Sequence, residues 1–248
     1  MGVEFYHAER FGMEVVKISD WQVSYPFHNH VSIFSVGVLL DGRIRVEIGD
    51  DVSRIGRGEC FTVAPLVPHR IFATEPYSLF CLCVKKEAVY REPSQVLHSR
   101  ALCLLRKAYG DGEPGGWWAP TLRRAIFSLK NFTGEADGAD EEIRRATALL
   151  ADRPEASLPI EFLSAQSHCS KSYFIRKFKA AVGLPPHRFQ LQNRVRKAQR
   201  LLPHARSVAD AALAAGFYDQ SHFIRAFMRQ TGLSPSAYRL ASRQVDVG

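Results

Sequence analysis

Two arginines lie at matching positions of a segment that occurs twice in the chain. Ser172-Tyr-Phe-Ile-Arg-Lys-Phe178 returns 49 residues later as Ser221-His-Phe-Ile-Arg-Ala-Phe227. In each copy the two phenylalanines are four residues apart, so they share one helical face and are expected to be buried. Arg176 and Arg225 then lie on the outward face beside an isoleucine. There a guanidinium can bridge N7 and O6 of guanine, while the isoleucine can contact a thymine methyl group in a DNA major groove.

A single copy of this segment would fit an amphipathic surface helix equally well, but the repeat extends further. Gly183-Leu184, Pro186 and Phe189 return as Gly232-Leu233, Pro235 and Tyr238. Each copy also follows a short helix-like segment. Two helix-turn-helix units in tandem are therefore predicted.

Three histidines suggest a second kind of chemistry. His28 and His30 would point to the same face of a strand, and His69 follows a later strand-like run. A metalloenzyme needs three or four ligands, usually histidines with a carboxylate, yet residues 31–40 contain no Asp or Glu. We therefore expect these histidines to line a pocket or to be hydrogen bonded by backbone. We expect no bound metal, no cofactor and no catalysis.

Short alternating or apolar runs in the first half of the chain predict strands. They cover residues 32–40, 43–48, 60–64, 70–73 and 79–84. Asp41-Gly42 is a strong signal for a two-residue hairpin, and residues 1–19 are expected to form an arm or an edge strand. Strands at this spacing indicate an antiparallel barrel or jelly roll with the three histidines at its mouth.

Two amphipathic helices are predicted after these strands, at residues 95–109 and from Pro120 onward. Their apolar faces could pack on the barrel or against a second subunit, and the sequence leaves both alternatives open. Gly134-Glu-Ala-Asp-Gly138 is the best linker candidate. Beyond it, a helix around residues 143–150 and the two helix pairs are predicted. The helix at 185–202, about 27 Å long, would join these pairs.

The net charge of +8 lies in one half of the chain. Residues 1–137 contain 16 Lys+Arg and 16 Asp+Glu, whereas residues 138–248 contain 17 and 9. This excess predicts a polyanionic partner for the second half. No apolar run approaches the ~20 residues of a membrane span. We expect no signal peptide, a cytoplasmic location and reduced thiols at the five cysteines.

The second half resembles the DNA-binding domain of the AraC/XylS family of bacterial transcription regulators. The resemblance is carried by residues 170–178, Gly183, Arg194, Ala198, Leu201-Leu202, Ser207-Val208, 216–223, Gly232 and 234–239. It implies seven helices with two helix-turn-helix units and a linking helix. Two positions depart from the family pattern: Ala211 stands in place of isoleucine, and Ser167 in place of the glycine of the first turn.

The resemblance also implies which residues contact DNA. Base contacts map to Ser172, Ile175 and Arg176 in the first unit, and to Gln220, Ser221, Ile224 and Arg225 in the second. Phosphate contacts map to Lys171, Lys179, Arg194 and His222.

The first half is similar to the cupin-like effector domain of the same family, through His28-Asn-His30, Gly58-Glu59 and residues 65–69. This similarity implies a small-molecule effector in the barrel and a homodimer. The expected effector-binding residues are Trp21, Phe27, His28, His30, Phe34, Val36 and His69. The apolar members of this set would serve equally as barrel core.

The expected organisation is therefore a cupin-like jelly-roll β-barrel plus an all-α tandem helix-turn-helix domain. We assign 1–92 to the effector domain, 93–133 to a connector that is also a candidate dimerisation element, 134–139 to a linker and 140–242 to the DNA-binding domain. The expected function is transcription regulation on double-stranded DNA under small-molecule control, with RNA polymerase as a candidate partner and no membrane role. The alternatives are a cupin metal-binding protein or enzyme fused to a DNA-binding domain, and a regulator controlled by a protein partner.

Overall fold

The computed structural model describes residues 2–110, 118–129 and 140–247 and divides them into two compact units. The first unit comprises residues 2–24, 30–110, 118–129 and 241–247, and the second comprises residues 25–29 and 140–240. The linker candidate at 134–138 lies outside the described residues. None of the helices in the described ranges combines the length and the apolarity needed to cross a bilayer.

The first unit contains a six-stranded sheet in the order β10-β1-β2-β9-β4-β7. The strands are β1 Gly2–Ala8, β2 Met13–Trp21, β4 Ile33–Asp41, β7 Cys60–Val63, β9 Tyr77–Lys85 and β10 Ser242–Gln244. Neighbouring strands run antiparallel except β1 and β10, which are parallel. The predicted strands at 32–40, 60–64 and 79–84 are confirmed, and residues 2–19 form β1, a 3-10 turn at Glu9–Phe11 and most of β2.

A second sheet has four strands in the order β3-β8-β5-β6. They are β3 Tyr25–His28, β5 Ile44–Ile48, β6 Asp51–Ile55 and β8 His69–Phe72. The described strands thus form two sheets and no closed barrel, an arrangement that is compatible with a jelly roll.

The predicted hairpin at Asp41-Gly42 is wrong. β4 pairs with β9 and β7, whereas β5 pairs with β8 and β6, so this turn crosses from one sheet to the other. Gly42 has a φ of 78°, and a Cβ at this position would lie 2.5 Å from the carbonyl oxygen of Pro76. The glycine is needed because the crossing is tight. The two-residue hairpin loop is Gly49-Asp50, between β5 and β6.

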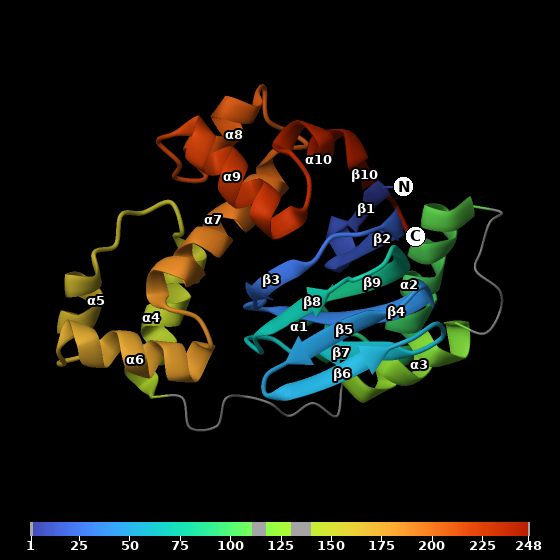
Figure 1. The fold of residues 1–248 in the computed structure, drawn as a ribbon, viewed down its shortest axis with the longest axis horizontal. Helices are drawn as coiled ribbons and strands as arrows, with labels where there is room; N and C mark the ends of the chain where they lie inside the picture. The colour runs from blue at the N-terminus through green and yellow to red at the C-terminus, as the bar shows by residue number, and fades with distance from the viewer. Residues whose placement is uncertain (1, 111–117, 130–139, 248) are drawn as a thin grey trace. The chain divides into compact units, whose positions relative to one another are not determined.

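Helices cover one face of the six-stranded sheet (Figure 1). They are α1 Lys86–Arg91, α2 Ser94–Tyr109 and α3 Trp118–Leu129. α2 and α3 confirm the two predicted amphipathic helices, whereas α1 was not predicted. Leu104 of α2 and Leu122 of α3 are fully buried with Val15, Val36 and Phe80 of the sheet. The apolar faces of both helices therefore pack within the chain.

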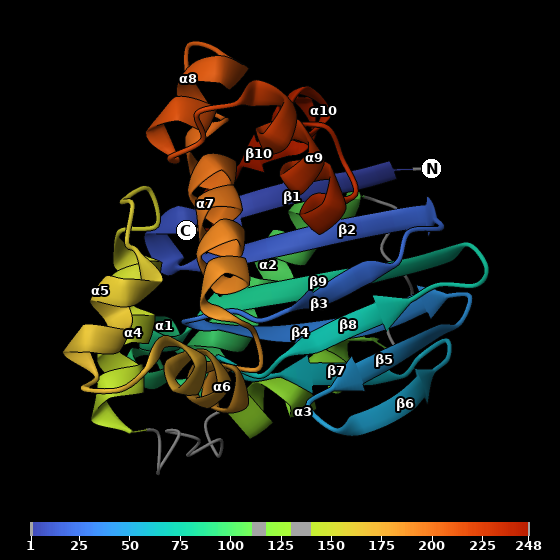
Figure 2. The same cartoon turned by 60° about the vertical axis from the view of Figure 1, so that its left-hand side comes forward.

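The second unit consists chiefly of helices. Residues 140–241 are described throughout and contain α4 Glu141–Asp152, α5 Ile160–Gln166, α6 Lys171–Val182, α7 Pro186–Leu201, α8 Val208–Ala214, α9 Gln220–Thr231 and α10 Pro235–Ala241. These are the seven helices that the resemblance implies. α7 contacts α4 and α6 as well as α8 and α9. Figure 2 shows α4–α6 towards one end of α7 and α8–α10 towards the other.

The short segment Tyr25–Asn29 is held in the second unit by Asn29, which is fully buried. The side-chain amide of Asn29 donates to the carbonyl oxygen of Val182 at 2.7 Å and accepts from Nε2 of Gln192 at 2.5 Å. The backbone N–H of Asn29 donates to Oε1 of Gln192, and its carbonyl oxygen accepts from Arg196. Buried amides with this many partners fix one local conformation.

Candidate nucleic-acid interface and histidine cluster

The two repeated segments fold into helices of equal length with equivalent ends. α6 begins after Ser170, whose side chain accepts from the N–H of Tyr173, and α9 begins after Asp219, whose carboxylate accepts from the N–H groups of Ser221 and His222. Both helices contain 12 residues. Each ends at a left-handed glycine, Gly183 with φ 76° and Gly232 with φ 75°. The repeat therefore fixes the boundaries of both helices through their caps.

The predicted buried faces of α6 and α9 are confirmed. The four phenylalanines of the two copies have no exposed surface; they are Phe174, Phe178, Phe223 and Phe227. The ring of Phe178 lies 5.6 Å from that of Phe189, and the ring of Phe227 lies 5.3 Å from that of Tyr238. These two pairs occupy equivalent positions of the repeat. Each helix is thus oriented by the same aromatic contact.

The opposite faces of α6 and α9 are open to solvent. Arg176 and Arg225 are exposed, and neither guanidinium has a hydrogen bond or an ion pair with any described residue. Ile175 is 38% exposed, and Ile224 is partly buried. The other predicted contact residues on these helices are also exposed: Lys171, Ser172, Lys179, Gln220, Ser221 and His222. Each helix therefore presents an arginine, an isoleucine and further polar or charged side chains.

Two of the predicted phosphate contacts already have partners inside the second unit. Arg194 is partly buried, and its Nε and Nη2 donate to the carbonyl oxygens of Pro154 at 2.7 Å and Ala156 at 3.4 Å. Lys171 forms an ion pair with Glu161, and this hydrogen bond lowers the pKa of the Glu161 carboxyl group. These contacts tie α7 and α6 to the segments that precede them.

Two further basic residues hold the helices together and were not singled out from the sequence. Lys177 of α6 forms ion pairs with Asp140 and Glu142 at the start of α4, and the hydrogen bond with Asp140 raises the pKa of the Lys177 amine. Lys197 of α7 lies 2.7 Å from Glu155. Only the folded chain reveals these pairs, because their partners are 35 residues or more away in sequence.

The turns of the two helix-turn-helix units use different residues. Gly216 in the second turn has a φ of 89°, and a Cβ there would lie 2.6 Å from Cα of Glu155. In the first turn the left-handed residue is His168, with a φ of 47°, and not Ser167, whose φ is −97°. Histidine adopts this conformation more readily than most residues, so a turn forms without glycine.

The fully buried Ala211 borders a surface pocket in the second helix-turn-helix unit. The pocket has a volume of about 240 Å³ and is lined by Leu201, His204, Ala205, Asp210, Ala211 and Ala214. The substitution of the family isoleucine by alanine thus coincides with space beside α8.

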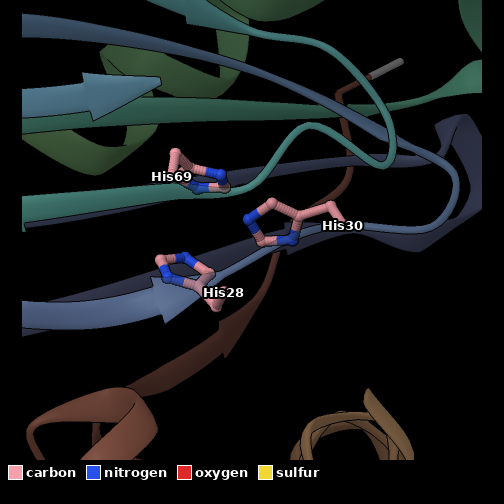
Figure 3. Close-up of side chains that lie close together, drawn as sticks. All are labelled: His28, His30 and His69. Atoms are coloured by element: carbon pink, nitrogen blue, oxygen red, sulfur yellow. The ribbon is translucent and has the colours of Figure 1, made fainter. Parts of the chain in front are cut away.

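Three of the predicted effector residues come together. His28 ends β3, His30 follows two residues later and His69 begins β8, the strand next to β3 in the four-stranded sheet (Figure 3). One side-chain nitrogen of each lies within 4.8 Å of the other two. The rings of His30 and His69 are 5.1 Å apart, and His69 is only 4% exposed.

The tautomers of two of these histidines are fixed by backbone. Nδ1 of His28 lies 2.8 Å from the carbonyl oxygen of Pro26, and Nδ1 of His69 lies 3.1 Å from that of Val67. A carbonyl oxygen only accepts, so each Nδ1 is the donor. In the neutral imidazole, the lone pair therefore lies on Nε2.

The four predicted apolar effector residues lie elsewhere. Phe34 and Val36 belong to the buried cluster that α2 and α3 form with the six-stranded sheet. Phe27 is 38% exposed. Trp21 ends β2, and its buried indole N–H has no hydrogen-bond partner among the described residues. The structure thus gathers the histidines and places Phe34 and Val36 in the helix-covered core.

The opposite face of β4 includes two small residues, Ser35 and Gly37, between Ile33 and Leu39. Ser35 alternates with Phe34 and so points to the other side of the sheet, where its Oγ lies 3.7 Å from Sγ of Cys83. Sγ of Cys83 is 4.0 Å from that of Cys81, and this contact together with burial raises the pKa of the Cys83 thiol. Ser35 and Gly37 within an apolar strand were the sequence signal for a distinct second face. All five cysteines are described, and none forms a disulfide.

Comparison with known proteins matches both halves of the chain. Residues 10–149 match the AraC-like ligand binding domain, and residues 163–241 match a helix-turn-helix domain. The chain is 36% identical over 82 residues to the HTH-type transcriptional regulator MtrA of Neisseria gonorrhoeae. That alignment covers 33% of this chain and 27% of MtrA, so the match spans about a quarter of the relative's length.

Solved structures show the same fold over nearly the whole chain. ToxT from Vibrio cholerae strain SCE256, bound to an unsaturated fatty acid, has a TM-score of 0.59 at 12% identity over 92% of this chain and 94% of its own. ToxT from strain O395 also has a TM-score of 0.59 at 12% identity, over 92% and 96%. Because the ligand-binding match alone covers more than half of the sequence, the chain belongs to the AraC/XylS family of helix-turn-helix transcriptional regulators.

Proposed function

We propose that this protein regulates transcription by binding a specific operator through α6 and α9, under the control of a small molecule bound by the first unit. The observation that carries the proposal is the equivalence of Arg176 and Arg225. They occupy the same position of two capped helices, both are exposed, and neither has a partner among the described residues. Two matched surfaces that each expose a guanidinium without a partner inside the protein favour the binding of an external ligand.

Each arginine suits a guanine in the major groove. A bidentate contact of this kind contributes about 1–3 kcal/mol of discrimination against other bases. Ile175 and Ile224 would contact thymine methyl groups beside it. The 16 residues of α7 extend about 24 Å. Successive major-groove faces lie about 34 Å apart, so binding of both helices would favour bent DNA and add indirect readout.

Phosphate contacts would supply the sequence-independent part of the affinity. Lys179 and His222 are exposed on the reading helices and suit this role directly. Lys171 would exchange its ion pair with Glu161 for a phosphate. Arg194 uses two of its five N–H groups on backbone carbonyls, which leaves three for DNA.

Control by a small molecule is the second part of the proposal. It is supported by the match to the AraC-like ligand binding domain and by the histidine cluster. Because ToxT shares the fold and was solved with an unsaturated fatty acid, fatty acids are the first ligand class to test. The proposed effector residues in the first unit are Trp21, His30 and His69, because Phe34 and Val36 lie in the helix-covered core and Phe27 and His28 belong to the second unit. Family membership favours a homodimer and a contact with RNA polymerase. It also favours a regulator without enzymatic activity.

Selection of operators from random DNA tests the reading helices. Arg225→Ala should relax the preference at one base position, and Arg176→Ala should relax it at a different position, each by about 1–3 kcal/mol. Lys179→Ala is the matched control, because it removes one positive charge from α6 and should weaken all sequences alike. The full-length protein is used in every case, with and without candidate fatty acids.

If all three variants lost the same affinity on every operator sequence, the assignment of Arg176 and Arg225 to base contacts and of Lys179 to a phosphate contact would be refuted. If the selected operators shared base preferences at only one half of the site, base recognition by both α6 and α9 would be excluded. An operator affinity that no candidate fatty acid changes would remove that effector class and leave the DNA-binding proposal intact.

A further inference from the structure

We propose that Cys81 and Cys83 form a two-thiolate site for one soft cation of the copper(I) class. Both residues lie on β9, and their sulfur atoms are 4.0 Å apart. The site lies wholly within the first unit and shares no residue with the histidine cluster. The proposal does not depend on DNA binding.

The sheet holds the two sulfurs on one face at a nearly fixed separation. Side chains alternate along a strand, so Cys81 and Cys83 point to the same side, opposite to Phe80 and Leu82 in the helix-covered core. β9 is paired with β2 on one side and with β4 on the other (Figure 1). Because both ladders hold its backbone, the Cα atoms of the two cysteines have little freedom to approach each other.

This separation suits a bridging ion better than a disulfide bond. A disulfide requires sulfurs about 2.05 Å apart and Cα atoms usually no more than about 6.8 Å apart. Residues two apart on a strand are separated by about 6.4–6.8 Å, at the limit of that range. By contrast, metal–thiolate bonds of about 2.3 Å place two sulfurs about 3.8 Å apart at a tetrahedral angle and about 4.6 Å apart in a linear arrangement. The observed 4.0 Å lies between these two values.

The number and type of donor atoms select a soft ion. Thiolate sulfur favours Cu⁺ and Zn²⁺, whereas Mg²⁺ and Ca²⁺ prefer oxygen. Zn²⁺ takes at least three ligands from the protein even in its open sites. Within residues 2–110, 118–129 and 140–247, no third His, Cys, Asp or Glu joins these two cysteines in a group able to hold a metal. Two thiolates alone therefore suit Cu⁺, which forms stable complexes with two sulfur ligands.

The neighbouring strand β4 completes the surroundings of both sulfurs. Ser35 is paired with Cys83, and its Oγ lies 3.7 Å from Sγ of Cys83. This hydroxyl can donate to the thiolate, an outer contact of the kind that holds metal ligands in place. Gly37 is paired with Cys81, and a Cβ there would lie 2.3 Å from Cζ of Phe61. The phenylalanine ring thus lies over the glycine and gives the site an apolar border.

Without a metal, Cys83 holds its proton. Contact with Cys81, burial and the nearby Glu14 carboxylate raise the pKa of the Cys83 thiol. A thiol that stays protonated is a poor nucleophile, so reaction with electrophiles is disfavoured. A soft cation instead displaces the proton, because the metal binds the thiolate form. Binding of Cu⁺ forms one copper–sulfur bond at each cysteine and releases the thiol protons to solvent, and copper and sulfur keep their oxidation states.

Titration of the full-length, tag-free protein with Cu⁺ under anaerobic conditions tests the site. A coloured Cu⁺ chelator removes weakly held ions, and the protein should still take up one equivalent per chain. Cys81→Ser and Cys83→Ser should each weaken binding by more than about 100-fold, because loss of an outer contact alone costs about 10- to 100-fold. Cys60→Ser is the matched control, since Cys60 is an exposed cysteine of the same unit, and it should bind as the unchanged chain does.

Ser35→Ala tests the outer contact separately. It removes the hydroxyl beside Cys83 and leaves both sulfurs in place, so it should weaken Cu⁺ binding by about 10-fold. Circular dichroism checks the fold of each variant.

X-ray absorption at the copper edge gives a readout that needs no variant. The unchanged protein with one equivalent of Cu⁺ should show two sulfur ligands and no nitrogen ligand. Loss of all copper to the chelator, nitrogen ligands on the bound ion, or a loss in Cys60→Ser equal to that in Cys81→Ser would each overturn the proposal. Operator binding is measured separately, so failure of one proposal does not affect the other.

Discussion

Whether a basic side chain in the second unit is used to bind DNA or to hold the fold depends on its partners. Arg176 and Arg225 have none among the described residues, whereas Arg194 donates to two carbonyl oxygens and Lys177 forms ion pairs with the start of α4. Sequence alone treats all four as positive charges on helices. The contacts separate candidates for DNA contact from residues that hold the helices in place.

Arg194→Ala is expected to lower stability in the absence of DNA. The substitution leaves the carbonyl oxygens of Pro154 and Ala156 without these donors. Hydrogen bonds from a charged group contribute about 1.5–3 kcal/mol. We therefore expect the free energy of unfolding of the second unit to fall by about 2 kcal/mol, measured by urea denaturation.

Arg200→Ala is the matched control for this measurement. Arg200 is an exposed arginine on the same helix with no partner among the described residues, so its loss should change stability by less than about 0.5 kcal/mol. An unchanged stability in Arg194→Ala, combined with a lowered DNA affinity, would assign Arg194 to phosphate binding alone.

At the level of elements, the caps of the repeated helices make a further prediction. The Asp219 carboxylate accepts the N–H groups of Ser221 at 2.9 Å and His222 at 3.1 Å, and so sets the first turn of α9. Asp219→Ala should destabilise the second unit by about 1 kcal/mol. It should also weaken operator binding, because the predicted contacts Gln220, Ser221 and His222 lie in that turn. Calorimetric melting and titration with an operator measure the two effects.

Asp219→Asn separates capping from charge. Asparagine caps a helix about as well as aspartate, so this variant should keep nearly all of the stability. It also removes a negative charge from a DNA-facing turn and should bind the operator at least as tightly. If Asn and Ala destabilise the unit equally, the charge of Asp219 matters and its capping bonds do not.

The helices could be predicted from sequence because their signals are local. Local signals fix the boundaries of α6 and the start of α7 within a few residues. They are the spacing of Phe174 and Phe178, the caps at Ser170 and Gly183, and Pro185-Pro186. The strands at 32–40, 43–48 and 79–84 were also recognisable, but their partners were not. Asp41-Gly42 carries a hairpin signature and yet joins two sheets, because pairing depends on residues far away in the chain.

The candidate sites were predictable to different degrees. The proposed DNA-contacting residues Arg176 and Arg225 follow from the repeat itself, and the structure places both on exposed helix faces. For the effector site, the sequence pointed to the histidines, but it also pointed to Phe34 and Val36, which lie on the sheet face covered by helices. Alternation along β4 defines two faces and does not say which of them α2 and α3 will cover.

For the whole molecule, the distribution of charge predicts which part of the chain makes DNA affinity depend on salt concentration. The first 137 residues are neutral overall, so the excess of +8 belongs to the remaining part of the chain. Each phosphate contact contributes about 0.9 to the slope of log affinity against log salt concentration. Lys179→Ala should therefore lower the magnitude of that slope by about 0.9. Fluorescence anisotropy at several salt concentrations measures it.

Arg57→Ala removes the same charge from the first unit, where Arg57 is exposed. We expect its salt slope to equal that of the unchanged protein. A reduction as large as that of Lys179→Ala would mean that DNA is sensed by the net charge of the chain and not by contacts on α6.

Asn29 has a consequence for dissecting this protein into fragments. It lies between His28 and His30 in sequence, but its amide satisfies Gln192 and the carbonyl oxygen of Val182 inside the second unit. A truncation that begins after residue 139 would deprive both groups of their partner. No single cut therefore yields an intact second unit, and a fragment lacking Tyr25–Asn29 is a different reference state from the same helices in the complete chain.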